Sequence, residues 1–134
     1  MVEGEKRNYC MTAGTLGAGE NEIKGSGIIS GHAYTLMGAY DIADKNGKKV
    51  RLVKMRNPWG EKEWNGAWGD NDPNWTPELR KELKVEKVND GVFFMELLDY
   101  LKYFDHTCVC MDVPENYVTK SLIYDGNKIK KETD

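Results

Sequence analysis

The sequence predicts an α+β fold, a twisted and largely antiparallel β-sheet or partly open barrel with short helices at its edge. Strand-like runs predominate, and the segment Asp44-Lys45-Asn46-Gly47 is typical of a tight hairpin turn whose two central residues have positive φ. Helical spacing occurs only in short segments late in the chain. The length of 134 residues is that of one ordinary domain, or of one lobe of a larger protein.

Several segments have the residue pattern of strands. They are residues 7–12, 28–42, 49–57, 92–95 and 106–112. The segment 28–42 carries apolar residues on both faces, which indicates a strand covered on both sides. In the segment 49–57, Val53, Met55 and Asn57 share one face, so we expect the Asn57 side chain to point toward the buried side.

Two short helices are expected. Thr76 is a good capping residue and Pro77 suits the first helical position, so one helix should begin there. A second, amphipathic helix is expected over residues 96–104, with an apolar face that contains Leu97, Leu98, Leu101 and Phe104. From Pro114 onward the chain is polar and lysine-rich. We therefore interpret residues 1–113 as the folded lobe and residues 114–134 as a linker or frayed tail.

The composition argues against several classes of protein. A net charge of −3 gives no reason to expect nucleic-acid binding, and no apolar run is long enough for a transmembrane segment. The charged first residues lack the apolar core of a signal peptide. Cys108 and Cys110 alternate with apolar residues, which is typical of buried thiols, and Cys10 makes the number of cysteines odd. These features favour a reduced, cytoplasmic protein over a disulfide scaffold.

Residues 31–60 form the predicted hairpin that organises the chain. His32 lies near the start of its first strand and Asn57 at the end of its second, so the two are neighbours in an antiparallel pair. Pro58 restricts Asn57 to an extended conformation. A histidine beside an asparagine supplies two members of a Cys-His-Asn catalytic set. By residue type alone, however, a histidine on a strand is more commonly structural.

Short motifs in this chain resemble those of the calpain family of cysteine proteases. They are Gly31-His32-Ala33-Tyr34, Arg56-Asn57-Pro58-Trp59-Gly60, Glu63-Trp64-Asn65-Gly66-Ala67-Trp68 and Asp90-Gly91-Val92-Phe93-Phe94-Met95. In this order they are similar to the second subdomain of the calpain protease core, over nearly the whole span 7–112. The resemblance implies a papain-like, two-lobed core. It also implies His32 as general base and acid, Asn57 as its orienting residue and Trp59 as a shielding residue in the cleft.

The nucleophile that the resemblance requires is not found in this sequence. None of the three cysteines lies in the glutamine- and glycine-rich helix-start context that the family's nucleophile needs. We therefore expect a fragment of an intracellular, calcium-dependent cysteine endopeptidase that is inactive alone. Its partners would be the cysteine-bearing first lobe and protein substrates. The alternative is a calpain-like protein that has lost its nucleophile and serves as a binding or regulatory module.

The resemblance also implies calcium as a cofactor. The family's calcium positions in this lobe correspond to Glu63, Asp70, the main chain at Val88, and Asp90. A further acidic position of the family corresponds to Val92, which offers no side-chain oxygen, so the affinity is expected to be weakened. The alternative is an acidic loop that is simply solvated.

Overall fold

The computed structural model describes residues 9–110, and in this range five strands form one open antiparallel sheet in the order β4-β3-β2-β1-β5. The strands are β1 (Cys10–Gly14), β2 (Ala33–Ala43), β3 (Lys49–Arg56), β4 (Val92–Glu96) and β5 (His106–Cys110). The helices are α2 (Pro77–Leu83) and α3 (Leu97–Tyr103). The predicted α+β fold is confirmed, and the sheet is open. The tail expected over residues 114–134 lies outside the described residues.

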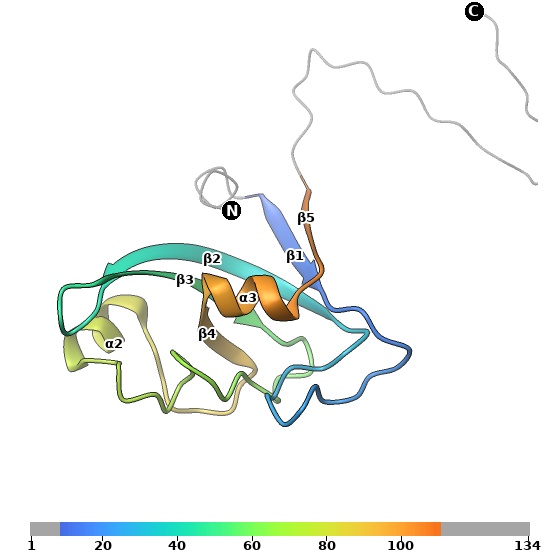
Figure 1. Cartoon of the computed structure of the whole chain (residues 1–134), viewed down its shortest axis with the longest axis horizontal. Coiled ribbons are helices and arrows are strands. Elements are labelled where there is room, and N and C mark those ends of the chain that lie inside the picture. Colours follow the sequence, from blue (N-terminus) through green and yellow to red (C-terminus); the bar gives the residue numbers. More distant parts are fainter. Residues whose placement is uncertain (1–8, 111–134) are drawn as a thin grey trace, which may run out of the picture.

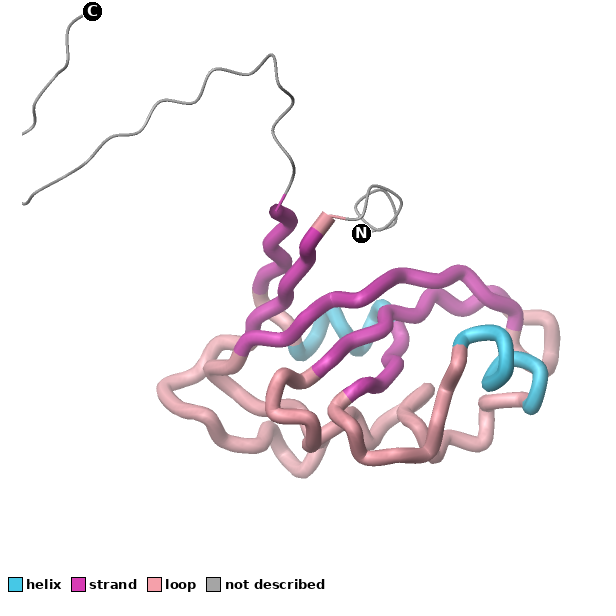
Figure 2. The backbone as a smooth tube through the Cα atoms, turned by 180° about the vertical axis from the view of Figure 1, so that it is seen from behind, coloured by secondary structure: helices cyan, strands magenta, loops and turns pink. Residues whose placement is uncertain are grey.

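The ends of the sheet differ in their surroundings. Strands β1 and β5 rise from one end as a two-stranded ribbon, and α2 lies near the opposite end (Figure 1). The view from behind shows the long connecting loops gathered along one side of the sheet (Figure 2). Two of these loops are joined directly, because the backbone N–H of Asn65 donates to the carbonyl oxygen of Ser26 at 3.0 Å.

The turn between β2 and β3 is longer than the sequence suggests. Gly47 has a φ of 79°, but Asn46 is not among the residues with positive φ, so the expected pair of positive φ values is wrong. The Asp44 carboxylate instead accepts hydrogen bonds from the backbone N–H groups of Asn46 and Lys48, at 2.8 and 2.9 Å. A side chain that caps the turn therefore replaces the tight two-residue geometry.

A bulge in β2 decides which of its side chains face which side of the sheet. The register with β3 shifts between Leu36 and Gly38. Tyr34 and Leu36, before the bulge, pack in one apolar cluster, whereas Tyr40, after it, packs against the other. Met37 is 42% exposed. Strand β2 is therefore covered on opposite sides along different parts of its length, and not on both sides throughout.

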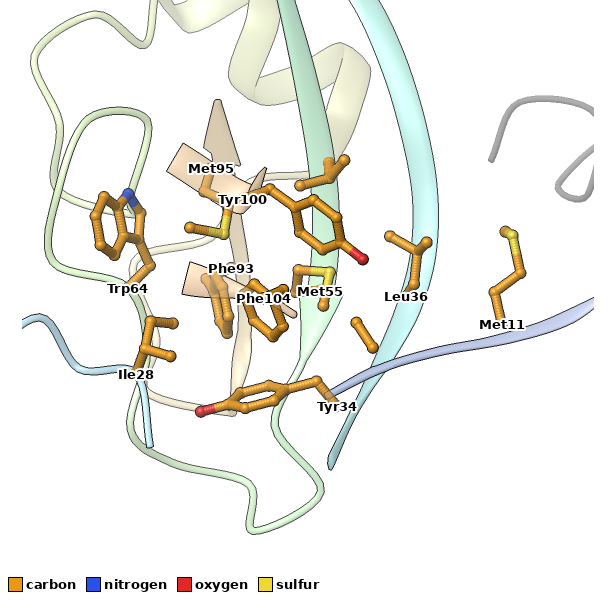
Figure 3. Packing of buried hydrophobic residues seen from close by; sticks show 12 residues of the cluster. Met11, Ile28, Tyr34, Leu36, Met55, Trp64, Phe93, Met95, Tyr100 and Phe104 are labelled. Carbon is orange, nitrogen blue, oxygen red and sulfur yellow. The ribbon is translucent and has the colours of Figure 1, made fainter. Parts of the chain in front are cut away.

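Two apolar clusters cover the two faces of the sheet, because the adjacent residues Leu52 and Val53 belong to different clusters. The larger cluster packs the sheet against α3 and against the loop that carries Trp64 (Figure 3). It contains Met11, Ala13, Ile28, Tyr34, Leu36, Val53, Met55, Trp64, Phe93, Met95, Tyr100 and Phe104. The smaller contains Val50, Leu52, Trp68, Trp75, Val85 and Phe94. Both faces of β3 are thus held by packing.

The two helices follow the predicted positions but not every predicted face. Helix α2 begins as expected, because Thr76 Oγ1 accepts a hydrogen bond from the backbone N–H of Leu79 at 3.3 Å. In α3 the predicted apolar face is wrong in part: Leu98 is 72% exposed and Leu101 is 62% exposed. Tyr100, which is 1% exposed, lies on the buried face instead. The orientation of α3 is set by packing against the sheet, which its own spacing does not reveal.

The cysteines are exposed, contrary to the expectation of buried thiols. Cys10, Cys108 and Cys110 are all free and exposed. They lie on the β1–β5 ribbon, where Cys10 is directly opposite Cys110. Strand β5 is an edge strand that is exposed along its whole length. Alternation with apolar residues therefore does not bury its thiols.

Candidate active site

His32 and Asn57 lie where the β2–β3 hairpin opens, just before β2 and just after β3. Their side chains are hydrogen-bonded, with 2.9 Å between Nε2 of His32 and Oδ1 of Asn57. The His32 side chain is 6% exposed and Asn57 is 0% exposed. Asn57 is buried like Met55, which agrees with the expectation that its side chain points toward the buried side. The hairpin thus brings together two polar side chains that are far apart in the sequence.

Three further residues hold Asn57, two of them through its side-chain amide and one through its backbone. Its Oδ1 also accepts a hydrogen bond from the backbone N–H of Trp59 at 3.1 Å, and its Nδ2 donates to the carbonyl oxygen of Lys62 at 3.1 Å. The backbone N–H of Asn57 donates to the carbonyl oxygen of Gly91 at 2.8 Å. Because Oδ1 is the acceptor, the facing Nε2 of His32 is the donor.

Gly91 allows this close approach of β4 to the end of β3. Its φ is 84°, and a Cβ atom at this position would lie 2.7 Å from the backbone oxygen of Asn57. A larger residue would be both strained and too close to that oxygen. The glycine in the Asp90-Gly91 turn is therefore part of the support for the asparagine.

Thr15 contacts the backbone of His32, and Tyr34 contacts its ring. The backbone N–H of His32 donates to Thr15 Oγ1 at 3.1 Å, and the backbone N–H of Thr15 donates to the carbonyl oxygen of His32 at 3.1 Å. The Tyr34 ring meets the imidazole edge-on, with 5.0 Å between ring centroids. Burial raises the pKa of the Tyr34 hydroxyl, which accepts a hydrogen bond from the backbone N–H of Ile29 at 2.9 Å. Thr15 belongs to no motif, so the sequence did not reveal this role.

Trp59 covers one face of the imidazole. The two ring centroids are 4.5 Å apart, and the rings are tilted by 49°. Trp59 is itself 45% exposed. The indole therefore contacts the ring while remaining partly open to solvent.

Glu20 contacts the other ring nitrogen of His32. Its Oε1 lies 2.9 Å from Nδ1, and the Glu20 side chain is 52% exposed. Glu20 lies in the loop between β1 and β2, a region without strand or helix periodicity. No pattern in the sequence connects it to the histidine.

The acidic residues expected to bind calcium gather next to this corner of the molecule. Oε1 of Glu63 accepts hydrogen bonds from the backbone N–H groups of Asp90 and Gly91, at 2.8 and 2.7 Å. Burial raises the pKa of Asp70 to about 7, and the negative charges of Glu63 and Asp90 add to the rise. The Asp70 carboxyl therefore lies close enough to the other two to be affected by their charges.

The donor set around Asp70 suits a hard cation only in part. The carbonyl oxygen of Val88 accepts from the backbone N–H of Asp90 at 3.0 Å, and Oδ1 of Asp90 accepts from the backbone N–H of Val92 at 2.8 Å. Within the range 9–110, no three acidic, histidine or cysteine side chains converge as a ready metal site. Oxygen ligands of the type that calcium prefers are present, and Val92 contributes no side-chain oxygen.

The thiols of the chain are remote from this corner. Cys10 is five residues along β1 from Thr15, which pairs with His32, and this corresponds to roughly 17 Å along a strand. Cys108 and Cys110 lie on the same ribbon, which points away from the loops (Figure 1).

No helix in the described part of the chain is long and apolar enough to cross a membrane.

A histidine and an asparagine paired at the open end of a hairpin are the residue types of a Cys-His-Asn protease. Comparison with known proteins gives the family. Residues 1–111 match the sequence model of a protein family described as "Calpain family cysteine protease". The chain therefore belongs to the calpain family.

Individual calpains show the same relationship. The chain is 40% identical to Calpain-9 of Mus musculus over 105 residues, which covers 75% of this chain and 15% of that protein. It is 36% identical to the Calpain-2 catalytic subunit of Bos taurus over 110 residues, or 80% of this chain and 15% of that protein. The chain thus spans about 15% of the length of the curated relatives it matches.

Proposed function

We propose that residues 1–113 form the His/Asn lobe of a calpain-type cysteine endopeptidase, and that residues 114–134 are a linker toward a further domain. The observation that carries this proposal is the 2.9 Å contact between Nε2 of His32 and Oδ1 of Asn57 in a chain of the calpain family. With Nε2 engaged by Asn57, Nδ1 is the ring nitrogen that remains for a nucleophile. The nucleophilic cysteine would be supplied by a first lobe outside this chain.

The proposed roles derive from the hydrogen bonds of the imidazole. Nδ1 of His32 takes the proton of the incoming thiol, and the resulting thiolate attacks the carbonyl carbon of a peptide bond. The proton then passes from Nδ1 to the leaving amine as the carbon–nitrogen bond breaks. In the second half, His32 takes a proton from the water that attacks the thioester, and it returns the proton to the departing thiolate.

Asn57 and Trp59 support this proton transfer without exchanging protons themselves. Asn57 Oδ1 holds the ring so that Nδ1 faces away from the asparagine, and the amide is prevented from rotating by its bonds to Trp59 and Lys62. The indole of Trp59 excludes water from one side of the ring. A thiolate–imidazolium pair is more stable where water is excluded in this way.

Calcium is proposed as a ligand of the same lobe. Glu63, Asp70 and Asp90, with the carbonyl oxygen of Val88, would hold the ion, which when bound supplies positive charge to a cluster of carboxylates. The proposal is supported by the raised pKa of Asp70, which is caused first by burial and then by the negative charges of Glu63 and Asp90. Protein substrates and an intracellular location are proposed from the family and from the three free thiols.

The test is a pair of histidine variants in the complete protein. His32→Ala should lower peptidase activity at least about 10³-fold, because general acid–base catalysis contributes on this scale. His106→Ala is the matched control, since His106 is exposed on β5, and it should retain activity. A His32→Ala protein as active as His106→Ala, or a complete protein with no activity at all, would favour the binding module.

A further inference from the structure

Both ring nitrogens of His32 face hydrogen-bond acceptors. Asn57 Oδ1 lies 2.9 Å from Nε2, and a Glu20 carboxylate oxygen lies 2.9 Å from Nδ1. The Asn57 oxygen cannot exchange places with its amide nitrogen, because Oδ1 also accepts from the Trp59 N–H. An ionised carboxylate can only accept. While Glu20 is ionised, its contact with Nδ1 is a hydrogen bond only when that nitrogen carries a hydrogen.

The position of Glu20 is the one that a nucleophile would need. Asn57 occupies Nε2, so a thiol can reach the ring only at Nδ1, where the Glu20 oxygen already lies. A thiolate and a carboxylate are both anions that can pair with an imidazolium. They therefore compete for one hydrogen and for one place beside the ring.

The loop holds the backbone of Glu20 while leaving its side chain accessible. Ser30 Oγ donates to the carbonyl oxygen of Gly19 at 2.7 Å, and the backbone N–H of Ser30 donates to the carbonyl oxygen of Asn21 at 2.8 Å. These bonds hold the backbone on either side of Glu20, whose Oε1 lies 2.9 Å from Nδ1 of His32. Because that side chain is 52% exposed, it can rotate into solvent without movement of the loop.

We infer that Glu20 is the internal counter-ion of His32, that it occupies the place of the nucleophilic thiolate in the separated lobe, and that it must rotate away when the thiol arrives. The inference rests on the proposed function of this lobe. Glu20 is a positioning residue, because it acts on the reaction through His32. While its carboxylate lies beside Nδ1, it keeps that nitrogen from the thiol, and in this way it opposes premature pairing.

The first experiment measures the ring nitrogens of His32 in the 134-residue chain by long-range ¹H–¹⁵N NMR at neutral pH. Glu20→Gln should move the ¹⁵N shift of Nδ1 toward that of a nitrogen without a hydrogen, relative to the wild-type chain, whereas Nε2 should keep its hydrogen in both chains. Glu22→Gln is the matched control, because the Glu22 carboxylate bonds the backbone N–H of Gly27 and not the histidine. Identical ring shifts in the wild type and Glu20→Gln would overturn the inference.

The second experiment measures alkylation of the nucleophilic cysteine by iodoacetamide in the complete protein without an activator. Glu20→Gln should raise this rate about three- to tenfold, the value of one partly exposed charge-assisted hydrogen bond. Glu22→Gln should leave it unchanged. An unchanged or slower rate in Glu20→Gln would overturn the competition between Glu20 and the thiolate.

Failure of the proposed function and failure of the role of Glu20 can be distinguished. If His32→Ala leaves peptidase activity intact, the proposed function fails, whatever the ring shifts show. If His32→Ala is inactive but Glu20→Gln alters neither the ring shifts nor the alkylation rate, the role of Glu20 alone fails.

Discussion

Two polar regions lie near the same end of the sheet, and they differ in how far the chain completes them. Around His32 and Asn57, each ring nitrogen and each amide atom has a partner within the described residues. Around Asp70, carboxylates approach one another, and burial with their negative charges raises the pKa of Asp70 to about 7. One of the buried guanidinium nitrogens of Arg80 has no hydrogen-bond partner there.

The difference shows what each region requires from outside the chain. The histidine region has its side chains held by hydrogen bonds, and for the proposed function it would need a thiol in place of Glu20 at Nδ1. In the acidic region the negative charges of Glu63 and Asp90 raise the pKa of Asp70 while Arg80 lowers it, and for the proposed calcium binding the region would take up a further positive charge. A preorganised hydrogen-bond network loses function when one member is removed. A repulsive cluster should gain stability when one charge is removed or when a cation neutralises it.

Removal of Asn57 should have the largest effect on the histidine region. Asn57→Ala frees the imidazole to rotate, so kcat/KM of the complete protein should fall about 10²-fold. It also leaves the Trp59 N–H and the Lys62 carbonyl without their partner, which should lower the free energy of unfolding by about 1–3 kcal/mol. Peptidase assays and thermal unfolding measure the two effects.

Asn65→Ala is the control for that variant. Asn65 donates one exposed side-chain hydrogen bond, to the carbonyl oxygen of Gly25 at 3.0 Å, and it does not touch His32. Its replacement should change kcat/KM less than about threefold. Equal losses in the two variants would mean that the histidine region is not specially organised by its amide.

Calcium should stabilise the acidic region and leave the histidine region unchanged. At a concentration of about 100 times the dissociation constant, the ion should raise the free energy of unfolding by about 2.7 kcal/mol. Glu63→Gln should remove most of this increase, because it takes one carboxylate from the cluster. Calorimetry with calcium and then with excess chelator measures the change. No increase in the wild-type chain would leave the cluster as a solvated acidic loop.

Without calcium, the acidic region should make stability depend on pH. The pKa of Asp70 is about 7 in the folded chain, against an ordinary value of 3.8. Between these values the folded state keeps a proton that the unfolded state releases, so stability falls as the pH rises toward 7. Asp70→Asn removes this fall and should be more stable than the wild type by roughly 2 kcal/mol above pH 7, and equally stable near pH 4.

Urea unfolding at a series of pH values provides the measurement, and Asp41→Asn is the control. Asp41 is exposed on β2, and its charge is not among those that shift the pKa of Asp70, so its replacement should leave the pH dependence in place. If the stability of Asp70→Asn still fell as the pH rose, a group other than Asp70 would be responsible for the fall.

The sequence predicted the elements that depend on local pattern. Strand periodicity and the turn at Asp44 placed His32 and Asn57 at neighbouring ends of one hairpin, and the Thr76-Pro77 start of α2 was predicted in the same way. These features derive from spacing and capping, which act over a few residues.

Features that depend on tertiary packing were not predictable. The bulge at Met37 reverses the alternation of side chains along β2, and no residue type in the sequence indicates a bulge there. The exposed faces of Leu98 and Leu101 result from how α3 meets the sheet. Glu20 reaches His32 from a loop without periodicity, 12 residues away in the sequence. Spacing rules do not describe contacts of this kind.

Trp59 gives the smallest and most selective prediction, because it contacts the histidine region without supporting the fold. It is 45% exposed, whereas Trp75 is 6% exposed within the smaller apolar cluster. Trp59→Ala should lower kcat/KM about tenfold by admitting water to the imidazole, and should change stability by less than about 1 kcal/mol. Trp75→Ala should instead cost about 3–5 kcal/mol of stability. Trp59→Phe, which keeps an aromatic ring over His32, should restore most of the activity. If Trp59→Ala unfolded as readily as Trp75→Ala, the indole would belong to the core. The prediction that Trp59 does not stabilise the fold would then be wrong.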